Sequence, residues 1–181
     1  LLDGVEGVEE LGLVKAVVLE SVRDTGVSVL NADDPEVVRL KERAGGRMIY
    51  FSAEENNPIV KQHLEAGGCA VVMQNGVVVL LSTEPPSRVL SIIEAPITLQ
   101  GIALFNTCNV LAAVAALHGL GLPAPTIRSG ITTFHPSATQ NPGRMNIIDF
   151  LNYKVVLDYG HNVPAVKALG RALPQLTTGR K

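Results

Sequence analysis

The sequence predicts an α/β fold in which a mixed, mainly parallel sheet is flanked by helices. Short continuous apolar runs, which are typical of strands covered on both faces, alternate with helical segments at the spacing of parallel crossover units. An Asn-Gly pair at positions 75–76 also separates two valine-rich runs. Because Asn and Gly tolerate the positive φ angles of a tight hairpin, one edge of the sheet is expected to be antiparallel.

The first half of the chain supplies most of the predicted crossover units. Residues 5–14 have the apolar spacing of a short helix, and the apolar runs at 16–19 and 27–30 are typical of buried strands. Asp34 is expected to cap the next helix, with Pro35 in its first turn. The other elements expected here are that helix at 36–43, a strand at 47–51, a helix at 58–66 and a strand at 69–73.

The second half begins with the antiparallel edge, where strands are expected at 77–81 and 89–93. The alanine-rich segment at 105–118 is the most strongly helical part of the chain, and glycines follow its end. A helix is expected at 125–132, and the segment 133–143, with two prolines and a glycine, has the composition of a linker.

Beyond this linker the pattern predicts two strands, at 145–150 and 153–157, and a helix at 163–173. We therefore expect one domain over residues 1–140 and the start of a second domain over residues 141–181. The chain opens without Met and ends where the α/β pattern would need another strand. Both domains are therefore expected to be incomplete.

Composition excludes several classes of partner. The chain has 181 residues, 15 basic and 17 acidic, dispersed along its length, so no basic stripe is expected for nucleic acid or anionic lipid. Neither a membrane span nor a signal peptide is visible, which favours the cytoplasm. Cys69 and Cys108 lack metal-ligand spacing and are expected to be buried thiols in a reducing compartment.

Polar residues follow two of the predicted elements at places where ligands bind. Asn31 and the acidic residues after it lie at the carboxyl end of a buried strand, where open α/β sheets place ligands, although Asp34 is also explained by capping. Asn106 and Asn109 share one face of a helix's first turn, and two side-chain amides there can bind a flat hydrogen-bonding ligand such as adenine. Asn106 alone could instead be a helix cap.

A third group of candidates lies beyond the linker. Arg144 offers a planar fork for phosphate, and Asp158 ends an apolar strand, where its carboxylate can meet a ribose hydroxyl or a metal-bound water. Either residue could instead belong to a surface ion pair. His161 belongs to the polar cluster that follows Asp158. The chain contains no GxxxxGK[ST] phosphate loop, no GxSxG elbow and no metal-binding His pair, so it is not expected to hydrolyse nucleotides by itself.

Taken in order, these motifs resemble the Mur ligase family. They are Asn-Ala-Asp-Asp-Pro at 31–35, the two asparagines at 106 and 109, Pro-Gly-Arg at 142–144 and Asp-Tyr-Gly-His-Asn at 158–162. Within this family the chain looks most like the Mur-ligase-like half of the cyanophycin synthetases. Two positions depart from the family pattern, namely Phe105, where many members have His, and Val163, which separates His161-Asn162 from Pro164.

The resemblance implies an enzyme in which a central ATPase domain and a Rossmann-like C-terminal domain close on ATP and Mg²⁺. A carboxylate is phosphorylated, and an amine attacks the acyl phosphate to form an amide. The resemblance also implies that Asn109, supported by Asn106, contacts adenine, that Arg144 contacts phosphates, and that Asp158 and His161 face the nucleotide. Asn31 is included among the ATP-binding candidates.

By likeness, the substrates are aspartate and arginine, joined into a polymer, and the enzyme can be a homo-oligomer. The phosphate loop and the metal-binding residues of the family are expected upstream of Leu1, so the chain itself is expected to lack ligase activity. Two alternatives remain open. One is another Mur ligase, of the folylpolyglutamate or peptidoglycan type, and the other is a non-catalytic ligase-like binding module.

Overall fold

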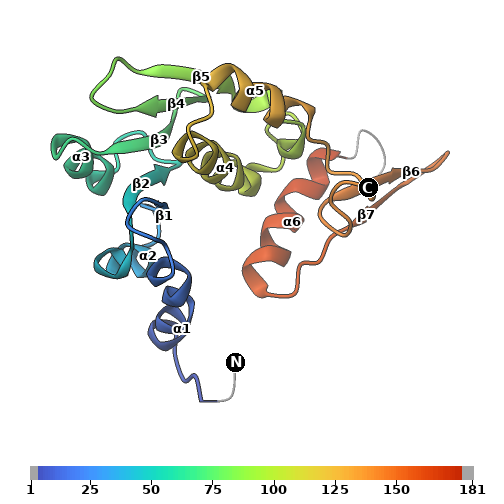
Figure 1. The fold of residues 1–181 in the computed structure, drawn as a ribbon. Coiled ribbons are helices and arrows are strands. Elements are labelled where there is room, and N and C mark those ends of the chain that lie inside the picture. The colour runs from blue at the N-terminus through green and yellow to red at the C-terminus, as the bar shows by residue number, and fades with distance from the viewer. Residues whose placement is uncertain (1–3, 177–181) are drawn as a thin grey trace.

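The computed structural model describes residues 4–176, in which a five-stranded sheet has the order β1-β2-β3-β4-β5 (Figure 1). Residues 1–3 and 177–181, on which the expectation of incomplete ends partly rests, lie outside the described residues. The strands are β1 (Val27–Asn31), β2 (Arg47–Ser52), β3 (Cys69–Gln74), β4 (Val77–Leu81) and β5 (Ser87–Ser91). The predicted α/β class with a mixed sheet is confirmed.

The direction of the strands changes at the predicted hairpin. β1, β2 and β3 are parallel neighbours, whereas β4 pairs antiparallel with both β3 and β5. Asn75 and Gly76 both have positive φ, of 49° and 77°, which is the backbone that a tight two-residue hairpin needs. The Asn-Gly pair therefore sets the antiparallel edge, as predicted.

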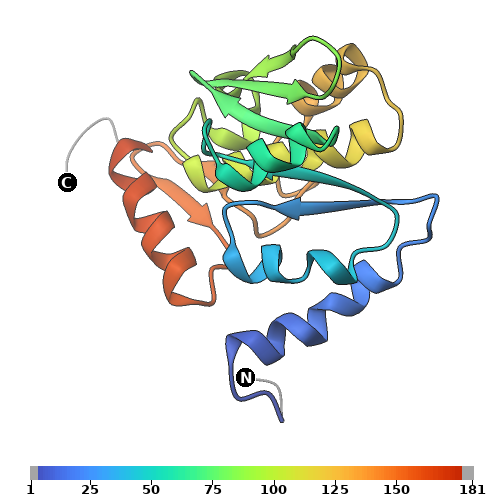
Figure 2. The same cartoon turned by 90° about the vertical axis from the view of Figure 1, so that its left-hand side faces the viewer.

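Helices cover both faces of the sheet (Figures 1 and 2). α4 (Thr107–Gly119) and α5 (Ala124–Thr133) pack on one face, and α2 (Pro35–Arg39) and α3 (Pro58–Glu65) on the other, with α1 (Val8–Glu20) against α2. Each buried strand alternates its side chains between the two layers. Ile49 and Phe51 point toward α4, and Tyr50 points toward α3.

Short elements connect these layers and lead to a second, smaller sheet. Within residues 4–176 the 3₁₀ helices are η1 (Lys41–Arg43), η2 (Ile92–Glu94), η3 (Pro96–Thr98) and η4 (Leu104–Asn106). The smaller sheet pairs β6 (Asn146–Asp149) antiparallel with β7 (Lys154–Leu157). α6 (Val163–Leu176) follows. The domain boundary at residue 140 and the Rossmann-like character of the part beyond it stay predictions.

One element was predicted wrongly. Residues 16–19, expected to form a strand, lie within α1, which runs unbroken from Val8 to Glu20. A short apolar run cannot be assigned to strand or helix by periodicity alone, and no Gly or Pro separates it from the helical pattern before it. Only Ala16 is buried in α1, and Val17 and Val18 are 57% and 68% exposed, so this run forms no part of the sheet.

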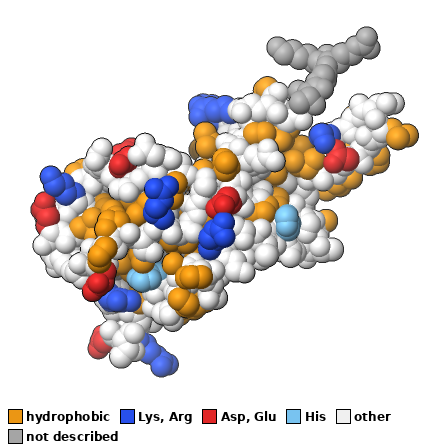
Figure 3. All heavy atoms as spheres, turned by 90° about the horizontal axis from the view of Figure 1, so that it is seen from above, with side chains coloured by type: hydrophobic (Ala, Val, Ile, Leu, Met, Phe, Trp, Pro, Cys, Tyr) orange, Lys and Arg blue, Asp and Glu red, His pale blue; other side chains and the backbone are white. Residues whose placement is uncertain are grey.

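The surface carries charged side chains of both signs, as the nearly balanced composition predicts. On the face shown in Figure 3, basic and acidic side chains are scattered among apolar ones. None of the helices within residues 4–176 combines the length and hydropathy needed to cross a bilayer.

Cys69 and Cys108 are free thiols, and burial raises the pKa of both. Cys69 is buried as predicted, but Cys108 is only half-buried.

His118, in the last turn of α4, should make stability fall at mildly acidic pH. Its burial, together with the nearby charge of Arg47, lowers its pKa below the ordinary value of 6.5. The folded state therefore binds this proton less readily than the unfolded chain, so stability is lost as pH falls through that value. We expect the urea midpoint to fall more in the wild type than in His118→Gln between about pH 7.5 and about pH 5.5. Equal shifts would contradict the prediction.

Candidate functional site

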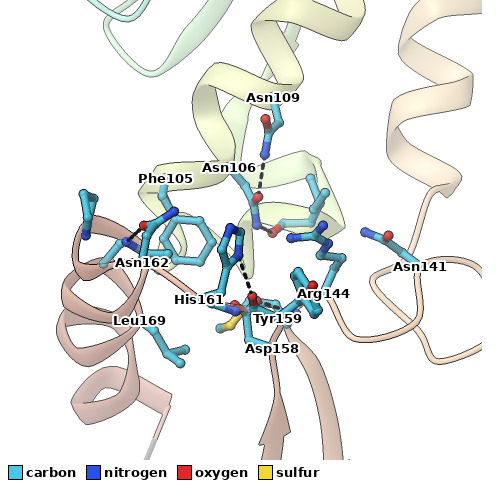
Figure 4. Close-up of a pocket in the computed structure, with 16 residues that line it drawn as sticks. Phe105, Asn106, Asn109, Asn141, Arg144, Asp158, Tyr159, His161, Asn162 and Leu169 are labelled. Atoms are coloured by element: carbon cyan, nitrogen blue, oxygen red, sulfur yellow. Dashed lines mark hydrogen bonds between the residues drawn. The ribbon is translucent and has the colours of Figure 1, made fainter. Parts of the chain in front are cut away.

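A cleft of about 630 Å³ lies between the start of α4 and the segment that runs from residue 141 into α6 (Figure 4). Five of the six predicted site residues line it, namely Asn106, Asn109, Arg144, Asp158 and His161. These residues are far apart in the sequence and come from both sides of the linker. The fold therefore brings two of the three predicted groups together in one place.

The two asparagines of this cleft are joined by a hydrogen bond. Asn106, 7% exposed, donates from Nδ2 to the backbone oxygen of Ile97 at 2.8 Å, and its Oδ1 accepts from Nδ2 of Asn109 at 3.0 Å. Asn106 occupies the cap position of α4, but its side chain makes no capping hydrogen bond. Helix capping therefore does not explain the side chain of Asn106. The side chain of Asn109 is exposed to the cleft.

Asp158 follows β7 and is held by two backbone amides. Its Oδ2 accepts from the N–H of Met145 at 3.0 Å, and its Oδ1 accepts from the N–H of Gly160 at 2.8 Å. Met145 is 2% exposed and has a φ of 50°, which is uncommon for a residue with a side chain. The carboxylate therefore has a fixed orientation and also joins the loop before β6 to the loop after β7.

Arg144 lies against an aromatic ring instead of a carboxylate. Its guanidinium carbon is 5.2 Å from the centroid of the Tyr159 ring, within the range of a cation–π contact. No carboxylate of residues 4–176 lies within salt-bridge distance of Arg144. The planar fork of donors is therefore open to an anion in the cleft.

His161 completes this side of the cleft. Its Nδ1 lies 3.2 Å from the carbonyl oxygen of Tyr159, and the two rings are 5.2 Å apart. A carbonyl oxygen only accepts, so Nδ1 carries the hydrogen and Nε2 is the nitrogen that faces away from this bond. Asn162 accepts from the N–H of Ala165 at 2.9 Å and so caps α6. Val163 and Pro164 are therefore accommodated in the first turn of this helix.

Two residues with a clear role in the cleft were missed by sequence reasoning. Asn146, 2% exposed, donates to the backbone oxygens of Pro136, Asn141 and Arg144 and accepts from the N–H of Gly143. It therefore holds the turn that carries Arg144. Tyr159 supports the guanidinium. Tyr159 stands inside the motif at 158–162, and Asn146 follows the Pro-Gly-Arg motif by two residues, so an Asn close after a Pro-Gly turn was the available signal.

Asn31 does not line the cleft. Its Oδ1 accepts from the N–H of Asp33 at 3.0 Å, in the turn after β1. Asp33 in turn accepts from Ser52, from the N–H of Ala53 and from Asn57, which joins the ends of β1 and β2. Asp34 caps α2 through the N–H groups of residues 36 and 37, as predicted. The structure therefore gives this motif an architectural role, and the nucleotide role of Asn31 stays a prediction.

The cleft suits a nucleotide better than a metal ion. Amide, carboxylate and guanidinium groups converge on it, and these match a base, a ribose hydroxyl and phosphates, respectively. Within residues 4–176, no three His, Cys, Asp or Glu side chains gather closely enough to hold a metal ion.

Comparison with known proteins gives consistent relatives. The Mur ligase middle domain family matches residues 2–117. The chain is 37% identical to a cyanophycin synthetase of Geminocystis herdmanii (strain PCC 6308) over 169 residues, 93% of this chain and 19% of the relative. It is 33% identical to a cyanophycin synthetase of Trichormus variabilis (strain ATCC 29413 / PCC 7937) over 177 residues, 98% of this chain and 20% of the relative.

A more distant relative is a UDP-N-acetylmuramoyl-L-alanyl-D-glutamate–2,6-diaminopimelate ligase of Streptomyces avermitilis. It is 32% identical over 158 residues, 85% of this chain and 28% of the relative. The chain thus spans about a fifth of the length of the cyanophycin synthetases it matches. These matches confirm the resemblance deduced from the motifs, and the chain belongs to the Mur ligase family.

Proposed function

We propose that this chain is the nucleotide-binding part of an ATP-dependent ligase that joins a carboxylate to an amine. The observation that carries the proposal is the convergence of Asn109, Arg144 and Asp158 on one cleft. The amide of Asn109 contacts the base, the carboxylate of Asp158 accepts from a ribose hydroxyl, and the guanidinium of Arg144 donates to phosphate oxygens. His161 lies beside them and faces the same ligand.

The reaction that fits is amide formation through an acyl phosphate. The γ-phosphoryl group of ATP passes to the carboxylate, and ADP leaves. The amine then attacks the carbonyl carbon of the acyl phosphate, inorganic phosphate departs, and the nitrogen loses a proton to give the amide. Arg144 would offset the negative charge of the transferred group, because preorganised donors act most strongly where water is excluded. Mg²⁺ would supply further charge neutralisation.

The substrates of the whole enzyme are proposed from its relatives. The match to a cyanophycin synthetase covers more of this chain, and at higher identity, than the match to the diaminopimelate ligase. We therefore propose that the whole enzyme joins arginine to aspartate side chains. Residues 1–140 would belong to the middle domain and residues 141–181 to the start of the C-terminal domain. The chain contains no GxxxxGK[ST] sequence, so we propose that it binds nucleotide without completing the reaction.

The test is to titrate the purified chain with ATP by calorimetry or NMR. Binding is expected, and Asn109→Ala should weaken it by about three- to tenfold, the effect of losing one hydrogen bond. Asn152→Ala is the matched control, because Asn152 is exposed in the loop between β6 and β7 and does not line the cleft. A chain that binds no ATP would exclude this function and favour the non-catalytic binding module.

A further inference from the structure

The tip of the β3–β4 hairpin joins an asparagine to a glycine and exposes both. Asn75 and Gly76 form the two-residue turn between Gln74 and Val77, which are the last pair of the antiparallel ladder. Both turn residues have a positive φ. Of the asparagines in the sequence, Asn75 alone is followed by glycine. The hairpin tip therefore combines an amide side chain with a neighbouring backbone nitrogen that no side chain shields.

The two groups that could react at this tip are not held by other parts of the protein. Within residues 4–176, the side-chain amide of Asn75 and the backbone N–H of Gly76 make no hydrogen bond. A Cβ built on Gly76 would meet no atom within 4 Å, so the space around its backbone is open. A ring that joins the side chain of Asn75 to the nitrogen of Gly76 can therefore form without displacing neighbouring atoms.

We propose that Asn75-Gly76 is a site of spontaneous deamidation that converts the exposed hairpin tip into aspartate or isoaspartate. The backbone nitrogen of Gly76 loses its proton to a base in solution and attacks Cγ of Asn75. The new N–C bond replaces the bond from Cγ to Nδ2, and the amide nitrogen takes up a proton and leaves as ammonia. Water then opens the resulting succinimide at either carbonyl. This inference is independent of the proposed nucleotide site.

The glycine and the position of the turn make the attack accessible at this asparagine. A residue with a Cβ after the asparagine would crowd the approach of the nitrogen, whereas glycine leaves it free and lets the backbone adopt many conformations. The attack requires the turn to open, and an exposed hairpin tip opens locally without unfolding the sheet. Asn152 provides a comparison, because it is also exposed at a hairpin tip, between β6 and β7, but is followed by Tyr153.

Isoaspartate at this tip would weaken the antiparallel edge of the sheet. The backbone oxygen of Gly76 accepts from the N–H of Ile92 at 2.9 Å and from the hydroxyl of Ser91 at 3.4 Å, so the tip is tied to the end of β5. Isoaspartate lengthens the backbone by one carbon, which a two-residue turn between paired strands accommodates only by changing its geometry. The isoaspartate form is therefore expected to unfold at lower urea than the original chain.

The experiment is to incubate the purified chain at mildly alkaline pH and to follow its peptides by mass spectrometry. The peptide that contains Asn75 should gain the mass of an amide-to-acid conversion about tenfold faster than the peptide that contains Asn152, because only the first has glycine next. Asn75→Gly is the matched control. Gly-Gly also suits a tight hairpin, so this variant should fold, show no mass gain at the turn and keep its urea midpoint after incubation, whereas the incubated wild type loses stability.

The nature of the product tests the mechanism. Attack by the nitrogen of Gly76 passes through the succinimide and must yield isoaspartate together with aspartate, which chromatography of the modified peptide separates. Aspartate without isoaspartate would mean direct hydrolysis by water and would overturn the proposed step. Equal rates at Asn75 and Asn152 would also overturn it. An unchanged urea midpoint in a sample rich in isoaspartate would overturn the proposed effect on the sheet.

Discussion

Arg144→Ala is expected to weaken ATP binding by about ten- to a hundredfold while adenosine binding changes by less than about twofold. Hydrogen bonds to a charged group contribute about 1.5–3 kcal/mol, and each 1.36 kcal/mol is tenfold in affinity. The guanidinium lies over Tyr159 and lacks a carboxylate partner among residues 4–176, so its donors are free for phosphate. Calorimetric titration with both ligands measures the difference.

Arg128→Ala is the matched control for this prediction. Arg128 lies in α5, pairs with Glu94 at 2.7 Å and does not line the cleft, so its loss should change neither affinity. Arg144→Lys keeps the charge but loses the planar fork, and an intermediate loss is expected. Equal weakening of ATP and adenosine in Arg144→Ala would show that Arg144 supports the shape of the cleft instead of contacting phosphate.

The loop that carries Arg144 explains how a surface arginine can be placed accurately. Asn146 ties the backbone of the turn before it, and Asp158 accepts from the N–H of Met145 directly after it. Backbone N–H groups that bond to a carboxylate also keep that carboxylate in one orientation. The phosphate and ribose contacts that we propose are thus positioned by the same set of hydrogen bonds.

Features that depend on local backbone chemistry could be predicted from the sequence. The Asn75-Gly76 hairpin and the Asp34 cap require only neighbouring residues, and both have the expected geometry. The site residues could be nominated from their positions, because open α/β sheets place ligands at the carboxyl ends of strands, although helix caps use the same residue types. Their convergence required the fold, since 35 residues separate Asn109 from Arg144.

Other features could not be predicted, because a short apolar run does not distinguish strand from helix and because a side chain can bond to any backbone group. The apolar residues 16–19 became helical because nothing before them ends the helix, and Val17 and Val18 are left exposed. The partner of Asn106 is a backbone oxygen, that of Ile97, and every residue carries such a group. The sequence left a cap open as an alternative for Asn106, where the structure has a hydrogen bond between two side-chain amides.

Leu111→Ala should destabilise the fold by about 3 kcal/mol, within the range of about 2–5 kcal/mol for a leucine removed from a core. Leu111 is fully buried on the face of α4 that packs against the sheet. Leu120→Ala is the control, because Leu120 follows the same helix but is 76% exposed, and its loss should cost less than about 0.5 kcal/mol. Urea unfolding followed by circular dichroism measures both free energies.

The difference in stability between the two leucine variants also bears on the nucleotide cleft. α4 carries Asn109 in its first turn and is held on the sheet by residues such as Leu111. If the helix is a scaffold for the amide, Leu111→Ala should unfold at lower urea yet still bind ATP while the chain remains folded. Similar free energies of unfolding for the two leucine variants would mean that α4 is not packed as described. The placement of Asn109 would then lose its physical basis.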